Sequence, residues 1–168
     1  MKVSKPHTIS RRKSIDTAAD PYLMTVTING MAVCKKCHSV FSNKRWSIDE
    51  DLYREKADQK GTSKVLCPAC RKVKDNFPGG IVTLRGEFLA EHKDEILNLI
   101  RNEEDRARGF NPLERIMAIK EQDEEMEITT TNEKLAQRIG KSLQRAYQGR
   151  VHYKWSHDTK LLRAEWSR

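Results

Sequence analysis

The four cysteines of this chain form two matched pairs, Cys34-Lys-Lys-Cys37 and Cys67-Pro-Ala-Cys70. Each pair has two residues between its cysteines, and 29 residues separate the pairs. A C-x-x-C turn directs both of its sulfur atoms to one point, so two such turns supply the four ligands of a tetrahedral zinc site. The sequence therefore predicts one structural Zn²⁺ ion held by all four cysteines.

Three other interpretations of the cysteines have less support. The first pair and His38 match the attachment motif of c-type haem, which requires export, and no apolar segment of a signal peptide follows the basic N-terminus. Cys67-Pro-Ala-Cys70 resembles a redox dithiol at the start of a helix, but residues 71–78 look too short and broken for a helix. Structural disulfides are disfavoured in the cytoplasmic location that we expect.

Composition favours a charged partner. Hydrophobic residues make up 37% of the chain and charged residues 33%, so the core is small and a bound metal would help to stabilise it. No apolar run approaches the roughly 18 residues of a membrane span, so we expect no membrane contact. The formal net charge of +8 favours a polyanion as partner, provided that the basic residues are clustered.

The chain divides into three predicted parts. Residues 1–20 are basic and poor in large apolar side chains, which predicts a disordered tail. Residues 21–79 contain both cysteine pairs and form the predicted zinc-ribbon domain. Residues 80–168 form a predicted α+β domain, and Pro78-Gly79-Gly80 marks its start, because proline and glycine favour turns.

The predicted α+β domain alternates strands with helices. Its expected elements are a strand at 81–84, a helix at 87–108, a hairpin at 116–130, a second helix that ends at Gly149, and a hairpin at 151–166. The second helix is expected to begin at a capping box, Thr130-Thr-Asn-Glu133. The order strand-strand-helix-strand-strand predicts a small antiparallel sheet with helices packed on one face.

Basic residues cluster in the second helix and around both cysteine pairs. In the helix they recur at intervals of three and four, which places them opposite the apolar stripe, and Arg150 extends this surface. Cations without carboxylates among them repel one another, and a phosphate backbone relieves that repulsion. We therefore expect RNA to bind at Lys35, Lys36, Lys44, Arg45, Arg71, Lys72, Lys134, Arg138, Lys141, Arg145 and Arg150.

Catalytic motifs are missing from the sequence. It contains no phosphate-binding loop, no G-x-S-x-G nucleophile turn and no H-E-x-x-H zinc motif. A zinc ion held by four thiolates has no open position at which to activate water. We therefore expect no enzymatic activity and no small-molecule substrate.

One stretch of sequence resembles a known family. Residues 67–85 read Cys-Pro-Ala-Cys-Arg-Lys-Val-Lys-Asp-Asn-Phe-Pro-Gly-Gly-Ile-Val-Thr-Leu-Arg, and Leu-Ala-Gln-Arg-Ile-Gly-Lys-Ser-Leu follows at 135–143, with Gly149 beyond it. This order of cysteine pair, aromatic-Pro-Gly-Gly turn and strand resembles the NMD family. That family is named after nonsense-mediated decay and contains the zinc-ribbon export adaptor of the large ribosomal subunit. The chain is most similar to its short bacterial-type relatives.

The resemblance covers about residues 31–166 and implies both a cofactor and a partner. It implies a zinc ribbon with Cys34, Cys37, Cys67 and Cys70 as ligands. It also implies association with ribosomal RNA or the large subunit, including its proteins. The larger members of the family carry more cysteine pairs than the two found here.

Two functions are consistent with the sequence. The first is a non-catalytic zinc-ribbon protein that binds RNA and acts on the ribosome or in mRNA metabolism. The alternative is a zinc-stabilised protein–protein adaptor or regulator that docks through the ribbon and the acidic helix at 87–108. Salt dependence separates them, because added salt weakens phosphate binding steeply and a largely apolar protein interface far less.

Overall fold

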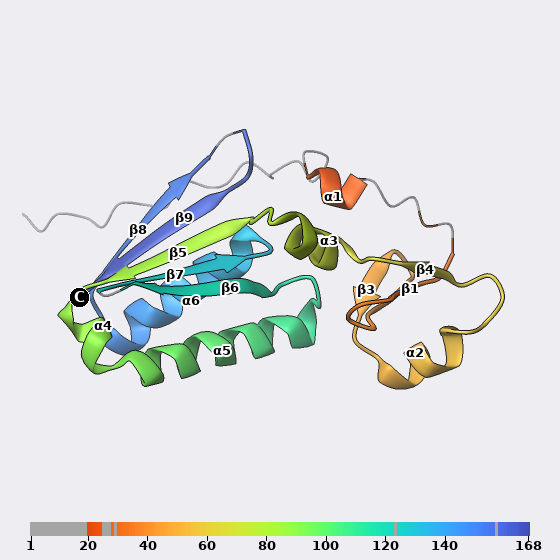
Figure 1. The fold of residues 1–168 in the computed structure, drawn as a ribbon, viewed down its shortest axis with the longest axis horizontal. Helices are drawn as coiled ribbons and strands as arrows, with labels where there is room; N and C mark the ends of the chain where they lie inside the picture. The colour runs from red at the N-terminus through yellow and green to blue at the C-terminus, as the bar shows by residue number, and fades with distance from the viewer. Residues whose placement is uncertain (1–19, 25–27, 29, 123, 157) are drawn as a thin grey trace, which may run out of the picture.

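The computed structural model of this chain describes residues 20–24, 28, 30–122, 124–156 and 158–168. All of the predicted basic tail except Asp20 lies outside the described residues. Figure 1 shows two β-sheets with helices, which confirms the predicted α+β class. In the part of the chain that the structure describes, no helix is long and apolar enough to cross a membrane.

The smaller sheet forms around the cysteine pairs. Its strands are β1 (Ala32–Cys34), β2 (Val40–Ser42), β3 (Arg45–Ser47) and β4 (Ser63–Val65), in the order β3-β2-β1-β4. β1 pairs antiparallel with β2 and parallel with β4, so the sheet is mixed. Helix α2 (Glu50–Lys56) connects β3 to β4, and the Asp49 carboxylate caps it by accepting the Leu52 N–H. We call β1–β4 with α2 the smaller unit.

Helix α3 (Pro68–Asp75) follows the smaller unit and corrects the prediction that residues 71–78 cannot support a helix. Cys67 is its N-cap, and the Cys67 sulfur accepts the Cys70 N–H. A proline occupies the first helical position, where its missing N–H costs nothing. Asn76 ends the helix in the left-handed conformation, which asparagine tolerates better than most residues. The short helix α1 (Pro21–Met24) contacts α3.

The larger sheet has the strand order β6-β7-β5-β9-β8. Its strands are β5 (Gly80–Arg85), β6 (Ile116–Gln122), β7 (Glu125–Thr130), β8 (Arg150–Trp155) and β9 (Leu162–Ser167). Both predicted hairpins form, but the predicted purely antiparallel sheet is wrong in one pairing. The second hairpin contacts the central strand β5 through β9, which runs in the same direction as β5.

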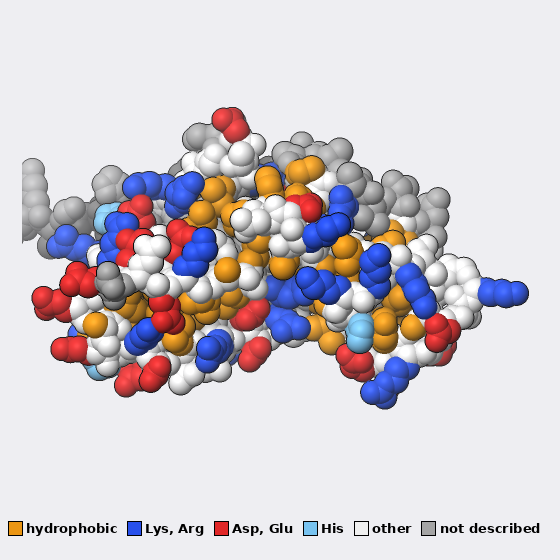
Figure 2. Space-filling model, in the orientation of Figure 1, with side chains coloured by type: hydrophobic (Ala, Val, Ile, Leu, Met, Phe, Trp, Pro, Cys, Tyr) orange, Lys and Arg blue, Asp and Glu red, His pale blue; other side chains and the backbone are white. Residues whose placement is uncertain are grey.

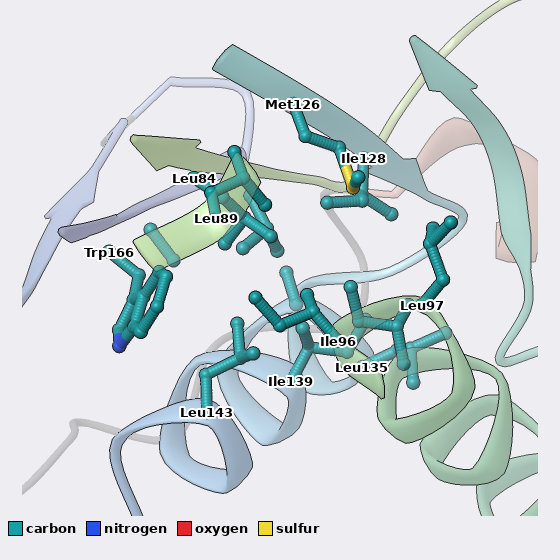
Figure 3. Close-up of a cluster of buried hydrophobic side chains, with 14 of the residues drawn as sticks. Leu84, Leu89, Ile96, Leu97, Met126, Ile128, Leu135, Ile139, Leu143 and Trp166 are labelled. Carbon is teal, nitrogen blue, oxygen red and sulfur yellow. The ribbon is translucent and has the colours of Figure 1, made fainter. Parts of the chain in front are cut away.

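Three helices pack on the same side of the larger sheet, which the sequence predicted, but the single helix expected at 87–108 is divided in two at His92 (Figure 1). They are α4 (Glu87–Glu91), α5 (Lys93–Phe110) and α6 (Glu133–Tyr147). Figure 3 shows Leu84, Ile128 and Trp166 of the sheet directed toward side chains of α5 and α6. Leu135, Ile139 and Leu143 of the predicted apolar stripe of α6 are fully buried in this core, whereas Ala146, also expected in the stripe, is exposed. We call β5–β9 with α4–α6 the larger unit.

The Pro78-Gly79-Gly80 segment, at the start of β5, packs closely against the beginning of α6. A Cβ atom on Gly80 would lie 2.4 Å from the Ala136 Cβ, and one on Gly79 would lie 2.6 Å from the Asn132 Cα. Neither glycine has a positive φ, so the backbone itself does not require glycine here. The two glycines instead let the start of β5 lie directly against the first turn of α6.

Candidate metal centre and basic surface

The four cysteines meet where the smaller sheet joins α3. Cys34 ends β1, Cys37 lies in the following turn, and Cys67 and Cys70 belong to the first turn of α3. Their sulfur atoms all lie within 4.8 Å of one another, and those of Cys37 and Cys67 are 3.6 Å apart. Four sulfur atoms bound to one zinc ion at about 2.3 Å would be about 3.8 Å apart. The predicted ligands are therefore close enough together to hold one metal ion.

Backbone N–H groups stabilise negative charge on these sulfur atoms. The Cys67 N–H donates to the Cys34 sulfur over 3.3 Å, and the Cys70 N–H donates to the Cys67 sulfur over 3.4 Å. Hydrogen bonds to an ionised acceptor are among the stronger ones in proteins. Cys34, Cys67 and Cys70 are at most 1% exposed, whereas Cys37 is half-buried. The cluster is thus largely closed to water, as a structural site requires.

The shared hydrogen bonds shift the pKa values of the thiols in opposite directions. The hydrogen bond with Cys34 lowers the pKa of Cys37. The hydrogen bond with Cys34 raises the pKa of Cys67, and burial raises it further. A cysteine binds a metal ion only as the thiolate, so protons compete with the metal for these sulfur atoms. A metal ion must displace these protons, so its binding weakens as the pH falls.

Arg115 reaches the cysteines from the larger unit. It lies just before β6, and its guanidinium donates to the Cys67 sulfur over 3.3 Å and to the Cys70 sulfur over 3.2 Å. Burial alone would lower the pKa of Arg115, but the hydrogen bond to Cys70 and the nearby thiolates raise it on balance. Four thiolates around a divalent ion keep excess negative charge, and the Arg115 cation offsets part of it.

Arg115 was not among the predicted site residues, because it lies 45 residues after Cys70 and no local spacing connects the two. The structure also shows that the His38 side chain contacts Tyr53. Its ring stacks on Tyr53, with ring centroids 4.2 Å apart, and its side chain is exposed. Among the described residues, only the four cysteines form a group that could hold a metal ion.

We predict that Arg115→Met lowers the affinity for Zn²⁺ by about 10- to 100-fold, the usual effect of losing a group that supports metal ligands. Methionine keeps much of the side-chain length but removes the charge and both hydrogen bonds. Competition with a chelating dye at fixed pH measures the change. Arg54→Met is the matched control, because Arg54 is 74% exposed and its partner Asp51 is 97% exposed. Unchanged affinity in Arg115→Met would show that its guanidinium contributes only packing.

Most of the predicted RNA-binding residues are exposed. Several of them form no ion pair with any residue that the structure describes. These are Lys35, Lys36, Lys44, Arg45, Lys134, Lys141, Arg145 and Arg150. Figure 2 shows that Lys and Arg side chains gather over the smaller unit and its junction with the larger one, whereas acidic and basic side chains alternate over the rest of this face.

Two of the predicted residues hold the fold together instead. Lys72 is 8% exposed, and its ammonium group donates to the Asp20 carboxylate over 2.7 Å and to the Thr131 carbonyl over 3.1 Å. Arg138 lies 3.8 Å from the carboxylate of Glu114, which is 5% exposed. A cation that balances a buried carboxylate cannot leave it without a large penalty. Lys72 is therefore held within the fold, whereas the positive charge of the 38% exposed Arg138 side chain is partly offset by Glu114.

Arg150 lies apart from the cations of α6. Along β8, Val151 and Tyr153 pack against the core on the helix side of the sheet. Because side chains alternate along a strand, Arg150 points to the face of the sheet opposite the described helices. The expectation that Arg150 extends the surface of α6 is therefore wrong. Arg71 is half-buried, and its guanidinium lies over the ring of Tyr22 at 5.3 Å.

Comparison of the chain with protein-family models, with curated proteins and with solved structures found no match. The function therefore has to be inferred from the chemistry of the cysteine cluster and of the basic surface.

Proposed function

We propose that this chain is a non-catalytic zinc-ribbon protein that binds RNA in the cytoplasm, with ribosomal RNA as its target. The exposed cations without ion-pair partners carry this proposal. The resemblance to the NMD family supports the choice of ribosomal RNA, and ribosomal proteins are then further possible contacts.

Zinc is the metal that the cysteine cluster suits best. A tetrahedral set of four sulfur ligands selects zinc or iron–sulfur centres. The sulfur atoms lie within 4.8 Å of one another, which suits a single central ion. With four thiolates bound, the ion has no open position for water, so its role is structural. Zinc would fix β1 against α3 and thereby hold the basic residues around both cysteine pairs in place.

RNA is the partner that the basic surface suits best. Helix α6 carries four cations. Arg138 lies beside Glu114, whereas the other three are exposed and form no ion pair with the described residues. These three are Lys134, Lys141 and Arg145. Lys35, Lys36 and Lys44 form a second exposed group beside the cysteines. Unpaired surface cations repel each other, and binding to phosphates both removes that repulsion and releases condensed counterions.

The adaptor hypothesis has less support, because part of the acidic helix α5 turns inward. Glu103 is 8% exposed and accepts a hydrogen bond from Arg106. The Glu104 carboxylate accepts the Ile116 N–H over 2.8 Å and so joins α5 to β6. These carboxylates have structural partners within the larger unit. They therefore contribute little to an acidic docking surface.

Reversing two exposed cations of α6 tests the proposal. We predict that Lys141→Glu/Arg145→Glu lowers the affinity for single-stranded RNA of any sequence. It should also flatten the slope of log K against log salt by about 1.4, since each lost phosphate contact accounts for about 0.7. Fluorescence anisotropy with a labelled RNA at several KCl concentrations gives both quantities. Stability should change by no more than about 0.5 kcal/mol, because both side chains are exposed.

A control variant makes the same change in net charge at cations that already have partners. Arg54→Glu/Lys64→Glu reverses residues paired with Asp51 and Asp58. It should affect RNA binding less than the α6 variant does. Co-sedimentation with ribosomes, with and without nuclease, then tests the choice of target. If the α6 variant binds RNA as the wild type does, its cations only face solvent and the adaptor hypothesis becomes the better one.

A further inference from the structure

A cleft lies between the β2–β3 hairpin of the smaller unit and the C-terminal end of α5. It has a volume of about 400 Å³, and its walls come from both units. Aromatic and basic side chains dominate the lining, which contains no carboxylate. The residues that matter for the argument are Phe41, Lys44, Arg45, Trp46 and Phe110.

The aromatic side of the cleft includes an exposed ring. Phe110, the last residue of α5, is 76% exposed, the highest value among the exposed large hydrophobic side chains of the described residues. Opposite it, Phe41 and Trp46 pack against each other with ring centroids 5.3 Å apart, and Trp46 is only 7% exposed. Phe110 thus adds little to the core, and its ring remains free to stack on a ligand.

The basic side of the cleft comes from the hairpin turn. Asn43 and Lys44 both have positive φ, at 50° and 62°, as a two-residue turn with mirror-image geometry requires. Glycine is the favoured residue at the second position of such a turn, and lysine adopts this conformation at a cost. The turn nevertheless places Lys44 in the lining of the cleft. Arg45 crosses to the other wall, where its guanidinium donates to the Phe110 carbonyl over 3.1 Å.

We propose that this cleft binds one nucleotide of single-stranded RNA, with the base stacked on Phe110 and the phosphate beside Lys44 and Arg45. The inference rests on the proposed RNA binding and assigns it a base-binding site. Aromatic rings beside cations are the combination by which proteins bind single strands, because every base has a stacking face and every nucleotide a phosphate. The volume lies within the usual range of about 300 to 1,000 Å³ for ligand sites. A duplex cannot use such a cleft, because its bases are already stacked.

Phe110→Ala in the full-length, zinc-loaded protein tests the inference. We expect its affinity for a labelled ten-nucleotide single-stranded RNA to fall by about 5- to 150-fold, the range for losing one base–aromatic stack. Its salt slope should stay unchanged, because no charge is lost. Affinity for a duplex of the same sequence should also stay unchanged. Phe110→Trp keeps an aromatic ring and should retain single-strand binding.

Two further variants separate stacking from charge and from general apolar contact. Lys44→Ala should lower the salt slope by about 0.7, the contribution of one phosphate contact to a single strand. Ile48→Ala removes another exposed apolar side chain, 51% exposed and outside the lining, and should bind RNA as the wild type does.

The outcomes distinguish the inference from the proposed function. If the wild type binds neither the single strand nor the duplex, RNA binding itself fails. If the wild type binds the single strand and Phe110→Ala binds it equally well, only the cleft assignment is overturned. An equal loss of single-strand and duplex affinity in Phe110→Ala would also overturn it, because base stacking predicts a loss for the single strand alone.

Discussion

Replacing Cys67 with serine is expected to abolish metal binding and to unfold the smaller unit. The strands of its sheet have only three residues each, and three of the five buried residues in the hydrophobic cluster that joins it to α3 are cysteines. Such a unit has too little apolar surface to fold alone. A structural zinc ion contributes about 10–16 kcal/mol of binding free energy, which in these sites is also folding free energy. The free energy lost with the ion therefore exceeds any stability that the strands could supply.

Cys67 has a particularly large effect because it has three functions. It is a metal ligand, it caps α3, and its sulfur accepts a hydrogen bond from Arg115. Elemental analysis should find one zinc per wild-type chain and none in the variant. Hydrogen exchange should show lost protection from β1 to α3 and retained protection from β5 onward. Full protection of the smaller unit in Cys67→Ser, or covalent haem in the wild type, would contradict the structural zinc site.

His38→Ala is the control for the cysteine variant. His38 directly follows the first cysteine pair, yet its ring stacks on Tyr53. Zinc content should therefore remain at one ion per chain. A loss of zinc in this variant would mean that the imidazole replaces one of the thiolates as a ligand.

The cysteine cluster could be predicted from sequence because the information is local. Two C-x-x-C pairs determine their own turn geometry, whatever the rest of the chain does. Arg115 could not be predicted, since its approach to Cys67 depends on how the two units pack. The same holds for Lys72 and Arg138. Their spacing places them on helices, but only tertiary contacts give them Asp20 and Glu114 as partners.

Errors in the predicted fold have similar causes. Hydrophobic alternation located both hairpins but carries no information on which strand of a hairpin contacts β5. The capping box at Thr130 was also misplaced. The side chain of Asn132 accepts the Leu135 N–H and begins α6 there, while the Thr130 hydroxyl donates to the Asn132 carbonyl. Threonine and asparagine are both suitable caps, so the spacing alone could not choose among the residues of this segment.

Ile139→Asp is expected to unfold the larger unit while the cysteine cluster still binds metal. Ile139 is fully buried between α6 and the sheet. An aspartate there loses the apolar contacts and places an unpaired carboxylate in the core, at a cost of more than about 4 kcal/mol. That is comparable to the whole stability of many small domains, about 5–15 kcal/mol. Circular dichroism and hydrogen exchange should show loss of the larger unit.

Lys141→Asp is the matched control for Ile139→Asp. Lys141 lies two residues further along α6 and is exposed, so the variant should remain folded. The metal content of Ile139→Asp then tests the division into two units. Unfolding the larger unit removes Arg115 from the thiolates, so we expect zinc to bind with the weakened affinity of Arg115→Met. Complete loss of zinc in Ile139→Asp would instead mean that the two units fold as one, and that the metal depends on contacts across their junction.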